Sequence, residues 1–132
     1  MRLRLLCCVL ASATLSWMSS RPARAGDLDA GARLARESCA SCHALRAGDK
    51  DEWGPSLVGI VDRPVGTEDG YRYASFLRQQ SATGATWTDA RLRVWLGDSK
   101  AVAKAAGART KMPAQNLSEA QLDALLAYLR TL

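Results

Sequence analysis

The chain has 132 residues, of which 48% are hydrophobic and 23% are charged, and its formal net charge is +5. A chain of this length fits one domain and its composition is typical of a globular protein, which excludes a multidomain enzyme and a disordered chain. The positive charge suggests a partner such as nucleic acid or an anionic membrane, so the position of the basic residues matters.

The first 25 residues have the pattern of a secretory signal peptide. A basic start is followed by an apolar run of 14 residues over 5–18 and by Ala23-Arg24-Ala25, a small-x-small end suited to signal peptidase. About 20 apolar residues are needed to span a bilayer, so this run is short for a membrane anchor. We therefore predict cleavage after Ala25, with an uncleaved anchor as the alternative.

Removal of residues 1–25 leaves a single predicted domain over 26–132. Four arginines and no acidic residue leave with the signal peptide, so the formal net charge falls from +5 to +1. No run of basic residues and no nucleic-acid motif remains, which excludes a nucleic-acid-binding protein. Cys7 and Cys8 are removed as well, and the domain keeps four residues suited to bind a cofactor or a metal: Cys39, Cys42, His43 and Met112.

A first helix is predicted from Asp27 toward Cys42. Asp27 is a suitable N-cap residue. Apolar residues then recur at helical spacing: Leu28, Ala32, Leu34 and Ala35. This stripe gives the helix one face to bury, and the helix leads directly into the motif that follows.

Residues 39–43 read Cys-Ala-Ser-Cys-His, the pattern of c-type haem attachment. The two cysteines bond to the vinyl groups on one edge of the porphyrin, and the histidine can lie beneath the iron as its proximal ligand. A thiol redox pair, a structural zinc site and a disulfide are the alternatives. Helical surroundings do not favour the first, zinc needs four ligands where the domain offers three, and a disulfide leaves His43 unexplained. We predict that Cys39 and Cys42 hold one haem c and that His43 ligates its iron.

Residues 44–87 are rich in Gly, Pro and Asp and are predicted to form a long loop region. No alternating strand pattern is found anywhere in the chain. A loop region of this length is unusual in a compact domain unless something else organises it. A covalently held macrocycle would do so.

Two further helices are predicted after this region. Thr88 caps the first, which places Leu92, Trp95 and Leu96 on one face before Gly97 ends it. A short Ala-rich helix then begins at Asp98 or Ser99 and ends at Gly107. Both are short enough to wrap around a planar cofactor.

Met112 is the only methionine of the predicted domain, and an iron bound by His43 needs either a sixth ligand or an open position. A methionine in a small domain is usually core filler. Residues 110–113, Thr-Lys-Met-Pro, form a polar segment without helical periodicity, so an apolar side chain there is best explained if it turns inward. His/Met ligation favours reduced iron and raises the haem potential, as expected for an electron-transfer haem rather than an oxygen-activating one, and a closed sixth position excludes substrate.

The last helix has the clearest signals. Ser118 and Gln121 match a capping box, and Leu117 and Leu122 are spaced as a hydrophobic staple. Leucines follow at i, i+3, i+4 and i+7, from Leu122 to Leu129. This pattern predicts one strongly buried helix face.

With these residues in view, the chain resembles the class I cytochromes c over essentially all of residues 26–132. Besides the Cys-Ala-Ser-Cys-His motif, the resemblance rests on segments whose order and spacing match the family: Gly54-Pro55-Ser56-Leu57-Val58-Gly59, Arg63, Gly70-Tyr71-Arg72-Tyr73, Gly84-Ala85-Thr86-Trp87 and Thr110-Lys111-Met112. The combination is specific, although Cys-x-x-Cys-His alone is not. The resemblance implies an all-α cytochrome c fold, with three to five helices around the haem. The N- and C-terminal helices would cross where Gly31 meets Leu125 and Tyr128.

The resemblance also implies roles for five residues around the haem. The carbonyl of Pro55 would accept a hydrogen bond from the His43 ring, and the hydroxyl of Thr110 would lie beside the methionine ligand. Three side chains would donate to the haem propionates: Arg63, Tyr73 and Trp87. Trp87 as a plain core residue and Arg63 as a solvated surface charge are the alternatives.

Three features depart from the family pattern. Trp95 stands where a tyrosine is common near the methionine sulfur, and an indole N–H can only donate. Residues 105–109 lack the usual Pro-Gly approach to the methionine, so the path of the chain to Met112 is open. The domain keeps four lysines, fewer than the lysine ring that many members present to acidic partners: Lys50, Lys100, Lys104 and Lys111.

The sequence therefore predicts a soluble periplasmic carrier that moves one electron on a His/Met-ligated haem c and is not an enzyme. Its expected partners are redox proteins, such as a periplasmic dehydrogenase, a cytochrome complex or a terminal oxidase. It would act as a monomer or in transient complexes, without nucleic acid and without stable membrane insertion. Two alternatives stay open: a ligand-binding or peroxidase-like haem protein, and an electron-entry subunit of a larger enzyme.

Overall fold

The computed structural model describes residues 25–49 and 53–132, and it forms an all-α fold. Five helices are found there: α1 (Ala25–Ser38), α2 (Ser75–Ala82), α3 (Asp89–Gly97), α4 (Ser99–Ala105) and α5 (Glu119–Leu129). Within the described residues the only strand-like pairing is an isolated antiparallel bridge between Pro64 and Thr86. The all-α prediction is confirmed. The predicted signal peptide lies outside the described residues, apart from Ala25.

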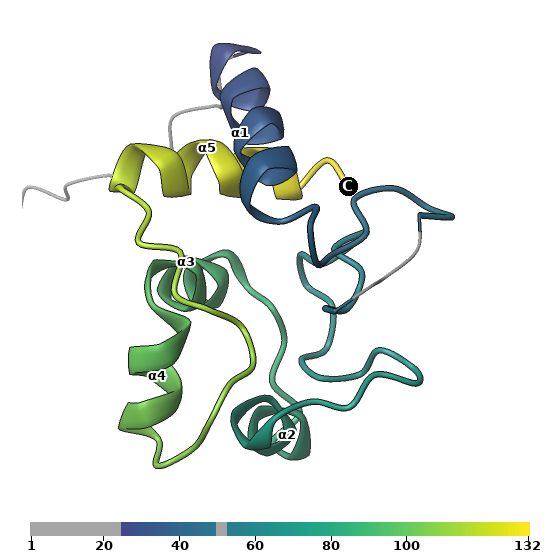
Figure 1. Cartoon of the computed structure of the whole chain (residues 1–132), viewed down its shortest axis with the longest axis vertical. Helices are drawn as coiled ribbons and strands as arrows, with labels where there is room; N and C mark the ends of the chain where they lie inside the picture. Colours follow the sequence, from purple (N-terminus) through teal and green to yellow (C-terminus); the bar gives the residue numbers. More distant parts are fainter. Residues whose placement is uncertain (1–24, 50–52) are drawn as a thin grey trace, which may run out of the picture.

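The helices form two groups joined by irregular segments. α1 and α5 cross at one end of the molecule, while α2, α3 and α4 lie toward the other (Figure 1). α3 contacts both α4 and α5, so it connects the two groups. In the part of the chain that the structure describes, no helix is both long and apolar enough to cross a membrane.

α1 differs from its prediction at both ends. It begins at Ala25, so Asp27 lies in its first turn rather than at the N-cap, a position that the helix dipole also favours for an acidic residue. It ends at Ser38 and does not continue to Cys42. The backbone then turns tightly, with the His43 N–H donating to the Cys39 carbonyl at 2.9 Å. The helix end therefore presents residues 39–43 as a compact turn.

The predicted crossing of the terminal helices is present and depends on Gly31 (Figure 1). A Cβ atom built on Gly31 would lie 2.1 Å from the Ala124 carbonyl oxygen and 2.8 Å from Cβ of Tyr128. Tyr128 was expected at this contact, whereas the nearest backbone belongs to Ala124 rather than to Leu125. Only a residue without a side chain permits this approach.

Gly31→Ala is therefore expected to separate α1 from α5 and to lower the free energy of unfolding of the haem-loaded protein by about 1–3 kcal/mol. Denaturant unfolding measures this change. Gly26→Ala is the matched control because it lies in the same helix with nothing within 4 Å of its Cβ position. An equal unfolding midpoint for the two variants would contradict the proposed close contact.

The loop region predicted over 44–87 contains a helix, α2, that the sequence analysis missed. Its N-cap is Ala74, which offers no side-chain hydrogen bond, and Phe76 is its one buried residue. Contacts with residues outside α2 stabilise this helix. The Phe76 ring stacks on the Trp95 ring with 5.2 Å between the centroids, and the Phe76 N–H donates to the Arg109 carbonyl at 3.1 Å. Tertiary contacts thus support a helix that has no local signal.

The predictions for α3 and α4 are confirmed. The Thr88 hydroxyl caps α3 by accepting from the Arg91 N–H at 3.2 Å, and the three predicted apolar residues are buried: Leu92, Trp95 and Leu96. Asp98 ends α3 and caps α4, its carboxylate accepting from the Ala101 N–H at 2.9 Å. α4 ends at Ala105, two residues before the predicted Gly107. One aspartate therefore forms the corner between the two helices.

α5 also follows its prediction. The capping box is complete, with Ser118 N–H donating to the Gln121 side chain at 2.9 Å and Gln121 N–H donating to the Ser118 hydroxyl at 3.3 Å. Leu117 packs half-buried against the core. The buried leucines of this helix supply much of that core: Leu122, Leu125, Leu126 and Leu129.

Candidate cofactor site

All nine residues that the sequence analysis assigned to the haem line one cavity. They come from four parts of the chain: Cys39, Cys42 and His43 from the turn after α1; Pro55, Arg63 and Tyr73 from the irregular region; Trp87 before α3; and Thr110 and Met112 before α5. The remaining lining is mainly apolar, including side chains of α3 and α5. The fold therefore gathers the predicted site from residues up to 73 positions apart in the sequence.

The two cysteines are free thiols in the structure. Burial raises the pKa of the Cys39 thiol to about 11, with a smaller contribution from Cys42. This raised pKa disfavours the thiolate form of Cys39. Two thiols beside an apolar cavity do fit attachment to the vinyl groups of a haem.

A structural zinc site is not supported by the positions of the side chains. Within residues 25–49 and 53–132, no three His, Cys, Asp or Glu side chains converge in a way that could hold a metal ion. Zinc in a structural site requires four such ligands in tetrahedral geometry.

The ring of His43 is held on one side by Pro55 and packed against Gly54. Nδ1 lies 2.6 Å from the Pro55 carbonyl oxygen, which can only accept, so Nδ1 carries the proton and Nε2 keeps its lone pair for a metal. A Cβ on Gly54 would lie 2.5 Å from Cε1 of the ring. The orientation of the imidazole is therefore set by its carbonyl partner and by the absence of a side chain at residue 54.

Met112 is half-buried and packs against the core, and its sulfur accepts a hydrogen bond from a residue of α3. The Trp95 indole N–H donates to Sδ at 3.1 Å. Thioether sulfur has two lone pairs, so one stays free for a metal. The Thr110 hydroxyl accepts from the Met112 backbone N–H at 3.1 Å, which places it beside the methionine as the resemblance implied. Trp95, which departs from the tyrosine common in the family, therefore donates a hydrogen bond directly to the methionine sulfur.

The three residues predicted to meet the haem propionates differ in their present partners. Trp87 is 7% exposed, and its ring lies beside that of Trp95, with 5.9 Å between the centroids. The Tyr73 hydroxyl accepts from the Glu68 N–H at 3.2 Å. Arg63 donates to the Val58 and Ser56 carbonyls and pairs with Glu68 at 3.3 Å. Arg63 is therefore a half-buried residue that supports the loop, not a freely solvated charge.

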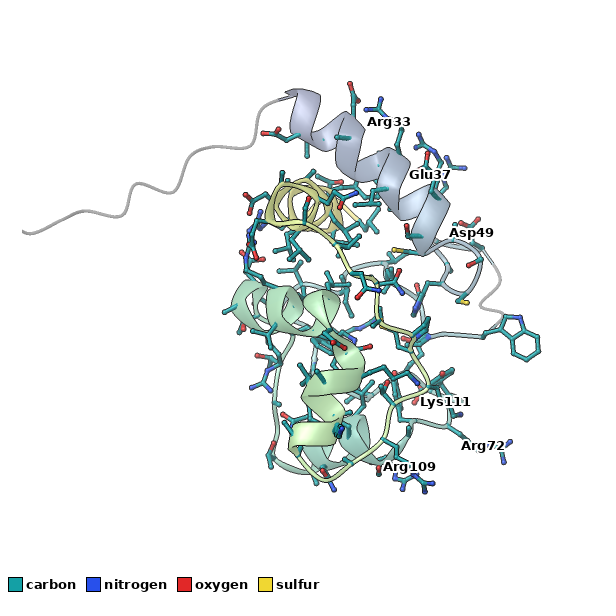
Figure 2. The ribbon with its side chains drawn as sticks, turned by 60° about the vertical axis from the view of Figure 1, so that its left-hand side comes forward. Arg33, Glu37, Asp49, Arg72, Arg109 and Lys111 are labelled. Atoms are coloured by element: carbon teal, nitrogen blue, oxygen red, sulfur yellow. The ribbon has the colours of Figure 1, made fainter. Side chains whose placement is uncertain are left out.

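The rim of the cavity contains residues that the sequence analysis did not assign to the site. Trp53 is 76% exposed, and its carbonyl accepts from the Tyr71 hydroxyl at 3.0 Å. The Lys111 ammonium lies 5.3 Å from the centre of the Tyr71 ring and donates to the Arg72 carbonyl at 2.6 Å. Figure 2 shows Lys111 and Arg72 on the same side of the molecule. Trp53 directly precedes the Gly-Pro pair, and this position was the only feature of the sequence that could have assigned it to the site.

The residues present fit a covalently attached haem. Two thiols, an imidazole with a free Nε2 and a thioether with a free lone pair line one apolar cavity. Trp87 lines the same cavity, and its indole N–H is a hydrogen-bond donor suited to a carboxylate.

Comparisons with known proteins identify the family of the chain. Residues 28–132 match the family model described as Cytochrome c. Cytochrome c2 of Rhodospirillum rubrum is 30% identical over 124 residues, which are 91% of each chain. Cytochrome c-550 of Nitrobacter winogradskyi is 36% identical over 104 residues, 78% of this chain and 88% of the relative.

Solved structures lead to the same family. Cytochrome c2 from Rhodospirillum centenum superposes with a TM-score of 0.71 at 28% identity, covering 80% of this chain and 98% of that one. Cytochrome cH from Methylobacterium extorquens gives a TM-score of 0.62 at 33% identity, covering 80% and 99%. The chain therefore belongs to the cytochrome c family: it is an electron carrier with one covalently attached haem c, and it is not an enzyme.

Proposed function

We propose that this chain is a periplasmic carrier of single electrons whose haem iron is ligated by His43 and Met112. The observation that carries the proposal is that the free Nε2 of His43 and the sulfur of Met112 line the same cavity as Cys39 and Cys42. Among the residues that line that cavity, His43 is the one histidine and Met112 the one methionine. The cytochrome c2 and c-550 relatives support the same conclusion.

When bound, haem c supplies a one-electron couple: the iron accepts an electron from one partner and gives it to another, with no bond made or broken. The chain's own residues hold this couple in place. Pro55 fixes the imidazole, and its hydrogen bond to Nδ1 makes the ring a stronger donor. The apolar lining excludes water, which favours the less charged ferrous state. Arg63, Tyr73 and Trp87 are the proposed partners of the propionates.

Export through the segment 1–25 would place the domain in the periplasm. The proposed partners there are a dehydrogenase, a cytochrome complex or a terminal oxidase, met in transient complexes. With a formal charge of +1 on the proposed mature chain, long-range steering by charge would be weak.

The test is the absorption spectrum of the oxidised holoprotein purified from the periplasm. We expect the weak near-infrared band of methionine-to-iron ligation, reversible one-electron reduction, and no binding of carbon monoxide to the reduced protein. The purified chain is expected to begin at Gly26, which mass spectrometry checks. A missing band together with tight carbon monoxide binding would instead support the ligand-binding alternative.

A further inference from the structure

Ser99 is the one buried polar residue in the described part of the chain, with 1% of its surface exposed. It is the first residue of α4, one position after the N-cap. Here Asp98 already caps the helix by accepting from the Ala101 N–H. The Ser99 hydroxyl is therefore buried without being needed to start its own helix.

The partners of this hydroxyl lie in the segment that contains Met112. Its Oγ is 3.1 Å from the Met112 carbonyl oxygen and 3.3 Å from the Pro113 carbonyl oxygen. Carbonyl oxygens only accept and a serine hydroxyl has one proton, so the hydroxyl shares that proton between the two carbonyls in a bifurcated hydrogen bond. Because a buried hydroxyl is costly to leave unpaired, these two carbonyls keep α4 and the Met112 segment together.

Among the other hydrogen bonds of this segment, the Lys100 ammonium of α4 donates to the Thr110 carbonyl at 3.4 Å, two residues before Met112, and none of them attaches the Met112 backbone itself to a helix. The Thr110 hydroxyl accepts from the Met112 N–H, and the Gln115 side chain donates to the Pro113 carbonyl, so both bonds stay within the loop. Trp95 reaches the sulfur but not the backbone. The Ser99 bonds are therefore the ones that join the Met112 backbone to the helical part of the fold.

We infer that Ser99 is a positioning residue for Met112. By donating to the two carbonyls it holds the methionine segment against α4, and it thereby sets how readily the Met112 sulfur leaves the iron. This inference rests on the proposed ligation by Met112. The sequence 105–109 lacks the Pro-Gly approach expected from the resemblance, and the Ser99 bonds supply a fixed point just beyond it.

The test uses imidazole as an added ligand for the ferric holoprotein, because imidazole binds the iron only when Met112 leaves. Loss of one hydrogen bond in Ser99→Ala is expected to raise the apparent affinity for imidazole about fivefold to tenfold. Ser99→Thr, which keeps the hydroxyl, is expected to return the affinity to near the wild-type value. If Ser99→Ala does not accumulate, Ser99→Cys has a similar size and a weaker donor, and it is expected to raise the affinity by a smaller factor.

Ser118→Ala is the matched control. It removes the N-cap hydroxyl of α5, which does not contact the Met112 segment, so it is expected to lower the free energy of unfolding and to leave the imidazole affinity unchanged. If Ser99→Ala, or Ser99→Cys in its place, matches this control in imidazole affinity, the serine is only structural and the inference fails. The near-infrared band of the wild-type protein distinguishes failure of the proposed ligation from failure of the Ser99 inference. Absence of the band overturns ligation by Met112 itself. If the band is present and the imidazole affinity of the Ser99 variant is unchanged, only the role of Ser99 is overturned.

Discussion

Met112→Ala is expected to open the sixth coordination position of the iron. The near-infrared band of the oxidised protein disappears, the reduced protein binds carbon monoxide, and the reduction potential falls by on the order of 0.1–0.3 V, within the roughly 0.8 V range that axial ligands set. The physical reason is that the cavity lining holds one thioether, and the Trp95 donor leaves its second lone pair free.

Leu117→Ala is the control for this variant. Leu117 is also a half-buried apolar residue that packs against the core, but it does not line the cavity, so its loss is expected to lower stability and to leave the band and the potential in place. Absorption spectroscopy under carbon monoxide and a redox titration make both comparisons. A Met112→Ala protein with an unchanged spectrum would show that another group ligates the iron.

Gly54→Ala is expected to displace the His43 ring from the orientation in which we propose that it ligates the iron. The added methyl group would lie 2.5 Å from Cε1 and less than 3 Å from both ring nitrogens. Neither side can move away easily: the Gly54 N–H donates to the Cys42 carbonyl at 2.8 Å, and the ring is bonded to Pro55. A strain of about 3 kcal/mol corresponds to a roughly hundredfold smaller population of the correctly ligated state.

The measurement for Gly54→Ala is the ratio of low-spin, His-ligated haem to total protein, together with the free energy of unfolding. Gly97→Ala is the control, since a Cβ at residue 97 meets nothing within 4 Å and the residue does not need a positive φ angle. Full low-spin occupancy in Gly54→Ala would mean that the ring can shift without losing the iron.

The helices that could be predicted are marked by interactions between residues close together in the sequence. Thr88 and Ser118 mark the starts of α3 and α5 because each side chain bonds a backbone N–H three residues further on. α2 has no such cap and one buried residue, so only its contacts with distant residues reveal it. The end of α1 at Ser38 was missed for a related reason, since the turn over 39–43 still contains helix-like hydrogen bonds.

The residues of the candidate site likewise divide into those that the sequence predicts and those that it does not. The cysteines and His43 are close together in sequence, so their spacing predicts haem attachment, and the downstream segments make the family specific. The role inferred for Ser99 was not predictable, because its partners are 13 and 14 residues away in a segment without periodicity. Trp53 was also missed, since a single aromatic residue before a Gly-Pro pair says nothing about its exposure until the loop is placed.

The corner that Asp98 forms between α3 and α4 affects how the site responds when the iron changes its oxidation state. Trp95 lies just before this corner and Ser99 just after it, and they bond the sulfur and the backbone of the same methionine. These bonds hold Met112 to α3 and α4 as well as to the loop that carries it. If Met112 is the sixth ligand, as we propose, this attachment would keep the geometry of the site similar in both oxidation states. A small reorganisation energy, and with it fast electron exchange, is then a property of this corner as much as of the haem.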